Sequence, residues 1–264
     1  MALWQTTRFR LDLTRPLVMG IVNNTPDSFS DGGHHHSVTA ALRHAEKLLK
    51  DGAHILDIGG ESTRPGSPAV PLEEEMRRVL PFVQAAVQFG VPISVDTYKA
   101  QVMQAVLDAG ADIINDVWAL RQPGAQSVVA SHPQCGVVLM HMHKTPQDMQ
   151  QTPMQGDAVA QVQNFLAQQT QALLALGVER QRIVWDYGIG FGKTVAQNFA
   201  LLAQQAALTR QGFALLAGWS RKSSLGQVTN LSVEERMVPS VAAAVLAVER
   251  GARIVRVHDV AETV

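Results

Sequence analysis

Two periodicities alternate along the chain. Almost wholly apolar runs of three to six residues recur eight times, and each is followed by a polar position and a segment whose apolar residues are spaced by three and four. Such runs are typical of buried parallel strands, and the longer spacing is typical of helices with one buried face. The runs cover residues 17–22, 54–58, 91–95, 112–114, 136–140, 182–185, 213–217 and 253–257.

This alternation predicts an α/β fold in which helices cover a parallel sheet. Eight strand and helix units in about 250 residues favour a (β/α)8 TIM barrel, and an open doubly wound sheet is the alternative. Between residues 4 and 13, apolar and charged side chains alternate, which predicts an N-terminal hairpin that acts as a flap. No linker or shift in composition divides the chain, so we expect one domain over residues 1–264.

The eighth helix is expected to be missing or shortened. Asp259 and Glu262 resemble a capping box, but the chain stops at Val264, about one turn later. The last strand would then lack most of its helical cover.

Composition narrows the class of function. Hydrophobic residues make up 46% of the chain and charged residues 17%, as in globular proteins, and the formal net charge is -1. A nearly neutral chain has no overall positive field for nucleic acid or anionic membranes. Because no run of about 18 apolar residues occurs, we expect a soluble, cytoplasmic protein. The single Cys135 excludes an internal disulfide and predicts an inert buried thiol.

Polar side chains follow nearly every predicted strand. In a barrel of this kind the active site lies at the carboxyl ends of the strands, so these residues are expected to converge on one rim. Asparagine and aspartate also begin turns and cap helices, which is the alternative for any one of them taken alone. The set comprises Asn23, Asp57, Asp96, Asn115, His141, Asp186, Ser220 with Arg221 and Lys222, and His258 after Arg256.

The set divides into two kinds of site. Carboxylates, an amide and an ammonium suit a flat heterocycle that bears N–H groups and a carbonyl. These residues are Asp96, Asn115, Asp186 and Lys222. Clustered cations suit a phosphate or diphosphate, because guanidinium groups can bind it bidentately. The residues of this anion group are Arg64, Arg221, Arg256 and His258.

Two loops and two short motifs lie near these positions. The loops at residues 25–33 and 59–68 are long and rich in glycine, so we expect lids or substrate clamps, with flexible surface as the alternative. The glycines at positions 188, 190 and 192 lack the spacing of a dinucleotide fingerprint and follow the sixth strand. His141 and His143 form an H-x-H pair that would hold a metal only with further ligands.

Eight motifs, in order along the chain, resemble those of the bacterial dihydropteroate synthases, a family of pterin-binding barrels. The resemblance extends from the first predicted strand to the last, and the ordered series is more specific than any single motif. The motifs are GIVNNTPDSFSDGG from Gly20, DIGGESTRPG from Asp57, SVDTYK from Ser94, INDV from Ile114, LMHM from Leu139, GFGK from Gly190, GWSRKS from Gly218 and RVHDV from Arg256.

The resemblance implies a transferase of folate biosynthesis. Such enzymes join 6-hydroxymethyl-7,8-dihydropterin diphosphate to 4-aminobenzoate, with Mg²⁺, and release 7,8-dihydropteroate and pyrophosphate. The implied partners are these small molecules, not nucleic acid or a membrane. Members of the family are sulfonamide targets and usually pair through helices near the C-terminal end, so a homodimer is implied, although the short last helix weakens that implication.

The resemblance also implies roles for individual residues. The pterin would be bound by Asp96, Asn115, Val117, Met140, Asp186 and Lys222. The diphosphate would be bound by Asn23, Arg64, Arg221, Arg256 and His258, and Asn23 would also bind the metal. The aminobenzoate would be bound by Phe29, Thr63, Pro65, Phe191, Lys222 and Ser223. The catalytic residues would be Asp96, Lys222, Asp31 and Arg256.

The chain departs from the family pattern at two positions. Tyr187 stands where the family usually has proline, which would add bulk beside Asp186, and Asn24 replaces an aliphatic residue.

Two alternative functions remain. A methyltetrahydrofolate-dependent methyltransferase would share the Asp96 pocket but would have little use for the cationic group. A noncatalytic pterin-binding paralogue would bind the pterin diphosphate without releasing pyrophosphate.

Overall fold

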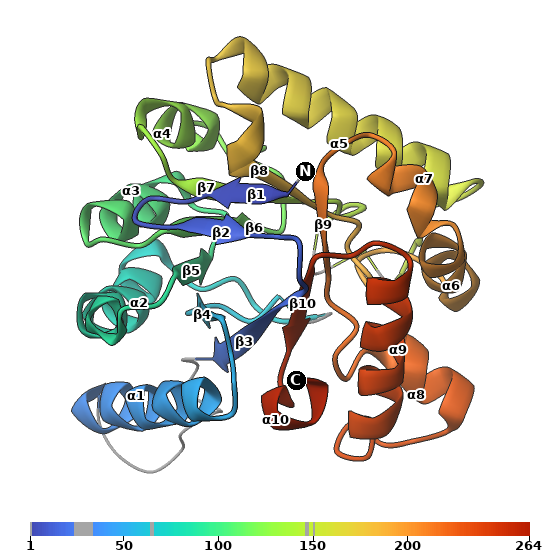
Figure 1. The fold of residues 1–264 in the computed structure, drawn as a ribbon, viewed down its shortest axis with the longest axis horizontal. Coiled ribbons are helices and arrows are strands. Elements are labelled where there is room, and N and C mark those ends of the chain that lie inside the picture. The colour runs from blue at the N-terminus through green and yellow to red at the C-terminus, as the bar shows by residue number, and fades with distance from the viewer. Residues whose placement is uncertain (1, 24–33, 64–65, 146–147, 150) are drawn as a thin grey trace.

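The computed structural model describes residues 2–23, 34–63, 66–145, 148–149 and 151–264. Eight parallel strands close a barrel in the order β10-β3-β4-β5-β6-β7-β8-β9 (Figure 1). The predicted (β/α)8 barrel is therefore confirmed, and the open sheet is wrong. The strands are β3 Leu17–Asn23, β4 Ile55–Gly59, β5 Ile93–Asp96, β6 Ile113–Asp116, β7 Gly136–Met140, β8 Ile183–Asp186, β9 Ala214–Ala217 and β10 Ile254–Val257.

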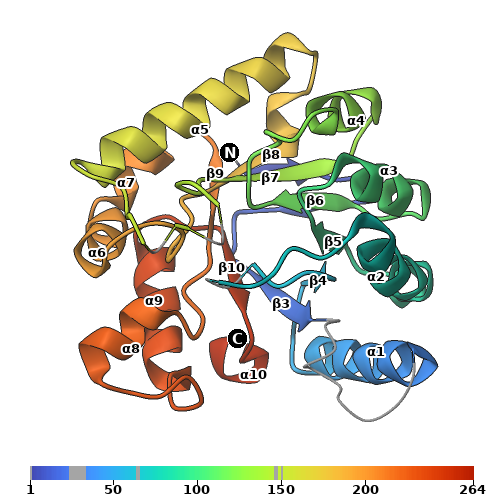
Figure 2. The ribbon, with the colours of Figure 1, turned by 180° about the vertical axis from the view of Figure 1, so that it is seen from behind.

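Helices surround the barrel, as Figures 1 and 2 show from two opposite sides. Their inward faces pack on the outward-facing strand residues and form the larger hydrophobic core; on α1, for example, Ala41, Ala45 and Leu48 are buried. Within the described ranges, no helix has the length and apolar character that crossing a membrane requires. The helices are α1 His34–Lys50, α2 Leu72–Ala86, α3 Ala100–Asp108, α4 Ala125–Ser131, α5 Ala158–Ala175, α6 Val195–Ala203, α7 Gln205–Thr209, α8 Ser223–Thr229, α9 Met237–Glu249 and α10 Val260–Thr263, with short 3₁₀ helices η2 Val87–Phe89 and η3 Arg180–Arg182.

The interior of the barrel changes from apolar to polar along the strands. Side chains two residues apart on a strand point the same way, so each strand contributes inward-facing residues at successive levels. A lower, apolar layer includes Ile55, Ile113, Val184 and Ile254. Two residues further along the same strands, the upper layer contains Asp57, Asn115, Asp186 and Arg256. The polar layer therefore lies at the carboxyl ends of the strands.

The N-terminal hairpin closes the barrel where the strands begin. Strands β1 (Leu3–Gln5) and β2 (Arg10–Asp12) pair antiparallel, and Trp4 is fully buried against the lower apolar layer. Arg8 forms an ion pair with the buried Asp112 at 2.6 Å, which ties the hairpin to the barrel. The predicted hairpin is confirmed, but its interpretation as a flap is wrong, since it plugs the end of the barrel opposite to the polar layer.

In this sequence the last helix, α10, has four residues. It lies between α1 and α9 in both views (Figures 1 and 2). Its Val260 is buried close to Gly20 of β3. The capping box expected at its start is wrong. Asp259 makes no side-chain hydrogen bond to the helix and instead pairs with Arg221.

Candidate active site

The polar layer is organised around Arg256. Its Nε donates to Asp57 Oδ2 at 2.6 Å, and its Nη2 donates to Asp96 Oδ2 at 2.9 Å. The sequence placed Arg256 in the anion group and Asp96 in the group that suits a heterocycle. These two groups are in direct contact, so a ring pocket and an anion site would share one edge.

Asp57 is an organising residue to which sequence reasoning gave no role. It is fully buried, and besides Arg256 it accepts hydrogen bonds from Ser94 Oγ at 2.5 Å and from Asn115 Nδ2 at 3.2 Å. The sequence named it only as one of the polar residues at strand ends; the period-two alternation indicates in addition that its side chain points inward, because Asp57 lies two residues beyond the inward-facing Ile55. Asp57 thereby fixes the directions of a guanidinium and an amide in the layer.

Two carboxyl groups of the layer are shifted toward their protonated forms. Burial raises the pKa of Asp96 to about 7, although Arg256 opposes the rise, and Asp57 adds to it. Burial also raises the pKa of Asp186, against a hydrogen bond of 2.7 Å from the Gly188 amide. A ligand that donates N–H bonds to these groups would favour their charged forms and lower both pKa values.

Lys193 is a second residue to which sequence reasoning gave no role. Its buried ammonium donates to the carbonyl oxygens of Gly188 at 2.8 Å and of His141 and Phe191 at 3.2 Å. Burial lowers its pKa to about 7, and Asp186 opposes that shift. The turn needs glycine, since φ is +65° at Gly188 and an added Cβ would lie 2.0 Å from the His141 oxygen. The glycine motif therefore builds a tight turn that the lysine ties together.

Lys222 joins the residues expected to bind pterin to those expected to bind aminobenzoate. Its Nζ lies 4.2 Å from the centre of the Phe191 ring, as in a cation–π contact. Phe191 also packs in a small apolar cluster with Val117 and Met140. Ser223, the first residue of α8, follows Lys222 directly and is exposed to solvent. The structure thus brings these five predicted residues to one side of the rim.

Arg221 and His258 at the rim have partners within the protein. Arg221 Nε donates to Asp259 Oδ2 at 3.0 Å, and this bond raises the pKa of the guanidinium. His258 Nδ1 lies 2.9 Å from Ser220 Oγ. Because Arg221 and Arg256 each pair with carboxylates, the anion group is less open than the sequence predicts.

Several predicted residues are only partly placed. Asn23 ends β3 and Thr63 follows β4, and both are partly buried. Lying outside the described residues are Asn24, Phe29, Asp31, Arg64 and Pro65.

Within the described part of the chain, no three His, Cys, Asp or Glu side chains form a group that could hold a metal, so the H-x-H pair gains no further ligands there. Cys135 is buried, as predicted.

The expectation that Tyr187 adds bulk beside Asp186 is wrong. Its buried side chain packs in the larger core, between strands and helices. The phenol donates to Gln205 Oε1 at 2.8 Å and accepts from Trp219 Nε1 at 3.3 Å. The tyrosine therefore ties β8 to α7 and points away from the barrel interior.

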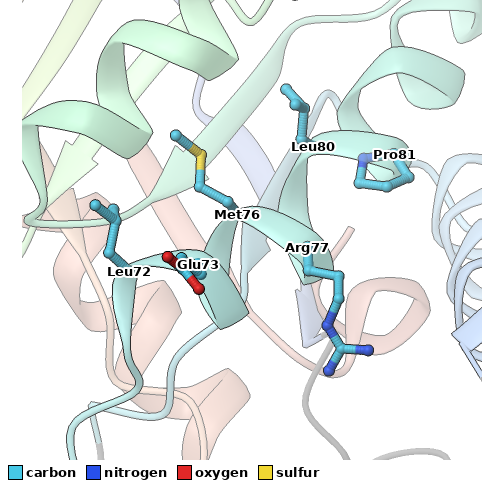
Figure 3. A pocket seen from close by; sticks show the side chains of 6 residues that line it. All are labelled: Leu72, Glu73, Met76, Arg77, Leu80 and Pro81. Carbon is cyan, nitrogen blue, oxygen red and sulfur yellow. The ribbon is translucent and has the colours of Figure 1, made fainter.

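Two hollows differ in their relation to the rim. A hollow of about 510 Å³ lies on the outer face of α2 and is lined by Leu72, Glu73, Met76, Arg77, Leu80 and Pro81 (Figure 3). None of the predicted site residues lines it. A smaller hollow of about 200 Å³ is lined by polar groups that include Lys193, Asn198 and Ser223, so it opens beside the predicted aminobenzoate residues.

A closed barrel with a charged layer at the carboxyl ends of its strands is the architecture of a TIM-barrel enzyme. A family model described as pterin binding enzyme matches residues 19–258 of the chain. Among curated relatives, the dihydropteroate synthase of Escherichia coli (strain K12) is 46% identical over 255 residues, which cover 96% of this chain and 90% of the relative. The chain belongs to this family of pterin-binding enzymes, and within it to the dihydropteroate synthases, which are transferases.

Solved structures agree with this membership. The dihydropteroate synthase of Xanthomonas albilineans, solved with 4-aminobenzoic acid, is 52% identical and has a TM-score of 0.90, covering 96% of this chain and 91% of that chain. The Burkholderia cenocepacia enzyme, complexed with 7,8-dihydropteroate, is 51% identical and has a TM-score of 0.89, covering 99% of this chain and 92% of that chain.

Proposed function

We propose that this chain joins 6-hydroxymethyl-7,8-dihydropterin diphosphate to 4-aminobenzoate and releases 7,8-dihydropteroate and pyrophosphate. The observation that carries the proposal is the polar layer, in which acidic, amide and cationic side chains meet at one end of the barrel. Two relatives were solved with 4-aminobenzoic acid and with 7,8-dihydropteroate, which are a substrate and a product of this reaction. A single pterin-binding domain over residues 1–264 would carry both substrates.

The pterin ring would lie against the polar layer. The residues in contact with it would be Asp96, Asn115, Asp186 and Lys222, with Val117 and Met140 as apolar walls. N–H groups on the ring would donate to the two carboxylates and favour their ionised forms. Burial raises the pKa of Asp96 to about 7, so binding of the ring would also ionise this residue.

The diphosphate would lie on the cationic side of the same layer. Its partners would be Arg256 and His258, with Arg221 and Arg64 further out. Mg²⁺ often takes only one or two protein oxygens and completes its shell with substrate phosphate and water. Asn23, at the end of β3, would be such a ligand, and the lack of a larger acidic group within the described residues fits this kind of site. When bound, the ion would neutralise charge on the leaving diphosphate.

The aminobenzoate would lie nearer the solvent. Its partners would be Phe29, Thr63, Pro65, Phe191, Lys222 and Ser223. The exposed hydroxyl of Ser223 would donate to the carboxylate, and the hollow of about 200 Å³ beside it leaves room for a small group. Phe191 would pack on the aromatic ring while it holds Lys222 by their mutual contact.

The chemistry of the reaction assigns roles to the charged residues. The bond between the pterin methylene and the diphosphate breaks, so negative charge develops on the leaving group and positive charge on the carbon. Arg256 would stabilise the negative charge on the leaving group. Anionic Asp96 would stabilise the positive charge on the carbon, and Asp31 would add to that effect. The amine of 4-aminobenzoate is a neutral nucleophile, so no covalent enzyme intermediate is needed, and its proton is lost after the C–N bond forms.

One assay tests the proposal directly. The purified chain, incubated with the pterin diphosphate, 4-aminobenzoate and Mg²⁺, should give 7,8-dihydropteroate detected by mass. Asp96→Asn should remain folded and lose most of the turnover. Folded wild-type protein that yields no product would overturn the proposed reaction, and an Asp96→Asn variant with unchanged rate would remove Asp96 from its role.

The proposal includes a homodimer that works in the cytoplasm. Exposed apolar side chains on α8 and α9 comprise Val228, Val238, Val245 and Leu246. Helix α9 lies next to the short α10 (Figure 1). A second copy would remove them from water. Leu246→Glu should shift the mass found by light scattering from dimer to monomer. A monomeric wild-type chain would contradict the dimer.

A further inference from the structure

A buried cluster of charges lies beside the polar layer but outside it. The Lys99 ammonium contacts the carboxylates of both Glu61 and Glu75, and the Tyr98 hydroxyl donates to Glu61 Oε1 at 2.9 Å. The charged side chains are only 15%, 7% and 1% exposed for Lys99, Glu61 and Glu75. Ion pairs so far from water are costly to break, because removal of one partner leaves an uncompensated buried charge.

The cluster joins three separate elements of the rim. Glu61 belongs to the loop after β4, Tyr98 and Lys99 follow β5, and Glu75 lies on α2. The loop is tied at its neighbouring residue as well, since Arg78 donates to the Gly60 carbonyl oxygen at 3.0 Å. Gly60 also packs close to α2, where an added Cβ would lie 2.5 Å from Val79. The start of the loop is therefore held against α2 at Gly60, and one residue later by the contacts of Glu61 with Lys99 and Tyr98.

The two carboxylates of the cluster belong to different parts of the chain, Glu61 to the loop after β4 and Glu75 to helix α2. Burial raises the pKa of Glu75, while Lys99 opposes the rise. Burial lowers the pKa of Lys99, but its bonds to Glu61 and Glu75 outweigh that effect and raise it overall. The lysine therefore stays charged and links a loop carboxylate to a helix carboxylate. The contact of Lys99 with Glu61 holds the loop, because Glu61 is part of it. The contact with Glu75 does not, because Glu75 lies within helix α2.

We infer that Glu61 is a positioning residue for the aminobenzoate. Held by Lys99 and Tyr98, it fixes the loop two residues before Thr63 and so presents Thr63 to the second substrate. Glu61 itself does not touch the substrate. The inference rests on the proposed function, in which Thr63 lines the aminobenzoate site, while the pterin pocket is held separately by Arg256 and its two aspartates.

The matched pair Glu61→Gln and Glu75→Gln tests this inference. Each variant removes one carboxylate from the same lysine and leaves it the other. Glu61→Gln should raise KM for 4-aminobenzoate by about tenfold, equivalent to about 1.4 kcal/mol, and leave KM for the pterin diphosphate within about twofold. Glu75→Gln should lower the melting temperature but leave both KM values within about twofold. Arg77→Met, at an exposed ion pair of α2, should change none of these quantities.

A second readout does not depend on catalysis. Hydrogen–deuterium exchange of the amides at residues 60–63 should be faster in Glu61→Gln than in wild type, and unchanged in Glu75→Gln. Equal effects of the two variants on aminobenzoate KM, or on this exchange, would overturn the positioning role. Wild-type protein that makes no dihydropteroate would instead refute the proposed function, and the exchange measurement would still decide whether Glu61 orders the loop.

Discussion

Replacement of Asp57 by asparagine is the most direct test of how the polar layer is organised. The substitution keeps the size of the side chain but replaces one oxygen by an NH₂ group. Asp57 accepts from Arg256, Ser94 and Asn115, so an NH₂ group must face at least one of these donors. If the NH₂ group faces Arg256, the guanidinium keeps only its bond to Asp96; if it faces Ser94, whose hydroxyl can accept, Arg256 is held by a neutral amide oxygen in place of a carboxylate and so less firmly.

The expected loss of stability follows from this geometry. Breaking a buried ion pair costs about 3–5 kcal/mol, but the Arg256 side chain is 23% exposed and retains Asp96, so we expect about 2–3 kcal/mol. For a chain of this length, 1 kcal/mol corresponds to about 2 °C in melting temperature. Asp57→Asn should therefore melt about 4–6 °C below wild type in calorimetry.

The expected effect on catalysis is larger than that on stability. If Arg256 loses its position, kcat/KM for the pterin diphosphate should fall by about 100-fold, or about 2.7 kcal/mol of transition-state stabilisation. Ser94→Ala is the matched control, because it removes one neutral donor from the same carboxylate and should change kcat/KM by less than about threefold. A variant that melts as predicted but keeps wild-type kcat/KM would refute the idea that Asp57 orients Arg256 for the reaction.

Three further outcomes are expected. In the proposed reaction Asp96 acts as an anion, and burial raises its pKa to about 7. On that proposal kcat/KM for the pterin diphosphate should rise as pH increases through about 7, and Asp96→Asn should lack this rise; a pH profile measures both. Trp4→Ala should lower the free energy of unfolding by about 3–5 kcal/mol without changing either KM, as denaturant titration and kinetics would show. EDTA should abolish product formation until Mg²⁺ is restored and leave the melting temperature unchanged, because in the proposed reaction the metal would be bound together with the substrate's phosphate; persistent activity in EDTA would exclude that role.

The fold could be predicted because each strand and helix carries its own periodicity. The eight apolar runs lie within two residues of the observed strand bounds. The hairpin was misread because the alternation in residues 8–13 indicates a strand pair but says nothing about where it docks. Its location depends on Trp4, which reaches the bottom of the barrel through contacts with residues distant in sequence.

The candidate site could be predicted only where a side chain's chemistry identifies its partner. Asp96, Asn115 and Asp186 stand out because they end apolar strands. Lys193 could not be placed, because its three acceptors are main-chain carbonyls, which leave no pattern in the sequence. The pairing of Arg221 with Asp259 joins chain segments 38 residues apart and depends on how β9 and β10 lie side by side.

The N-terminal hairpin covers the end of the barrel at which the strands begin. Because Trp4 is buried against the apolar layer at that end, two substrates and two products must all reach and leave the polar layer from the carboxyl ends of the strands. If 4-aminobenzoate binds at the exposed Ser223 and the pterin at the buried Asp96, as proposed, we expect the pterin diphosphate to bind first. Product-inhibition patterns that show random binding of the two substrates would contradict this expectation.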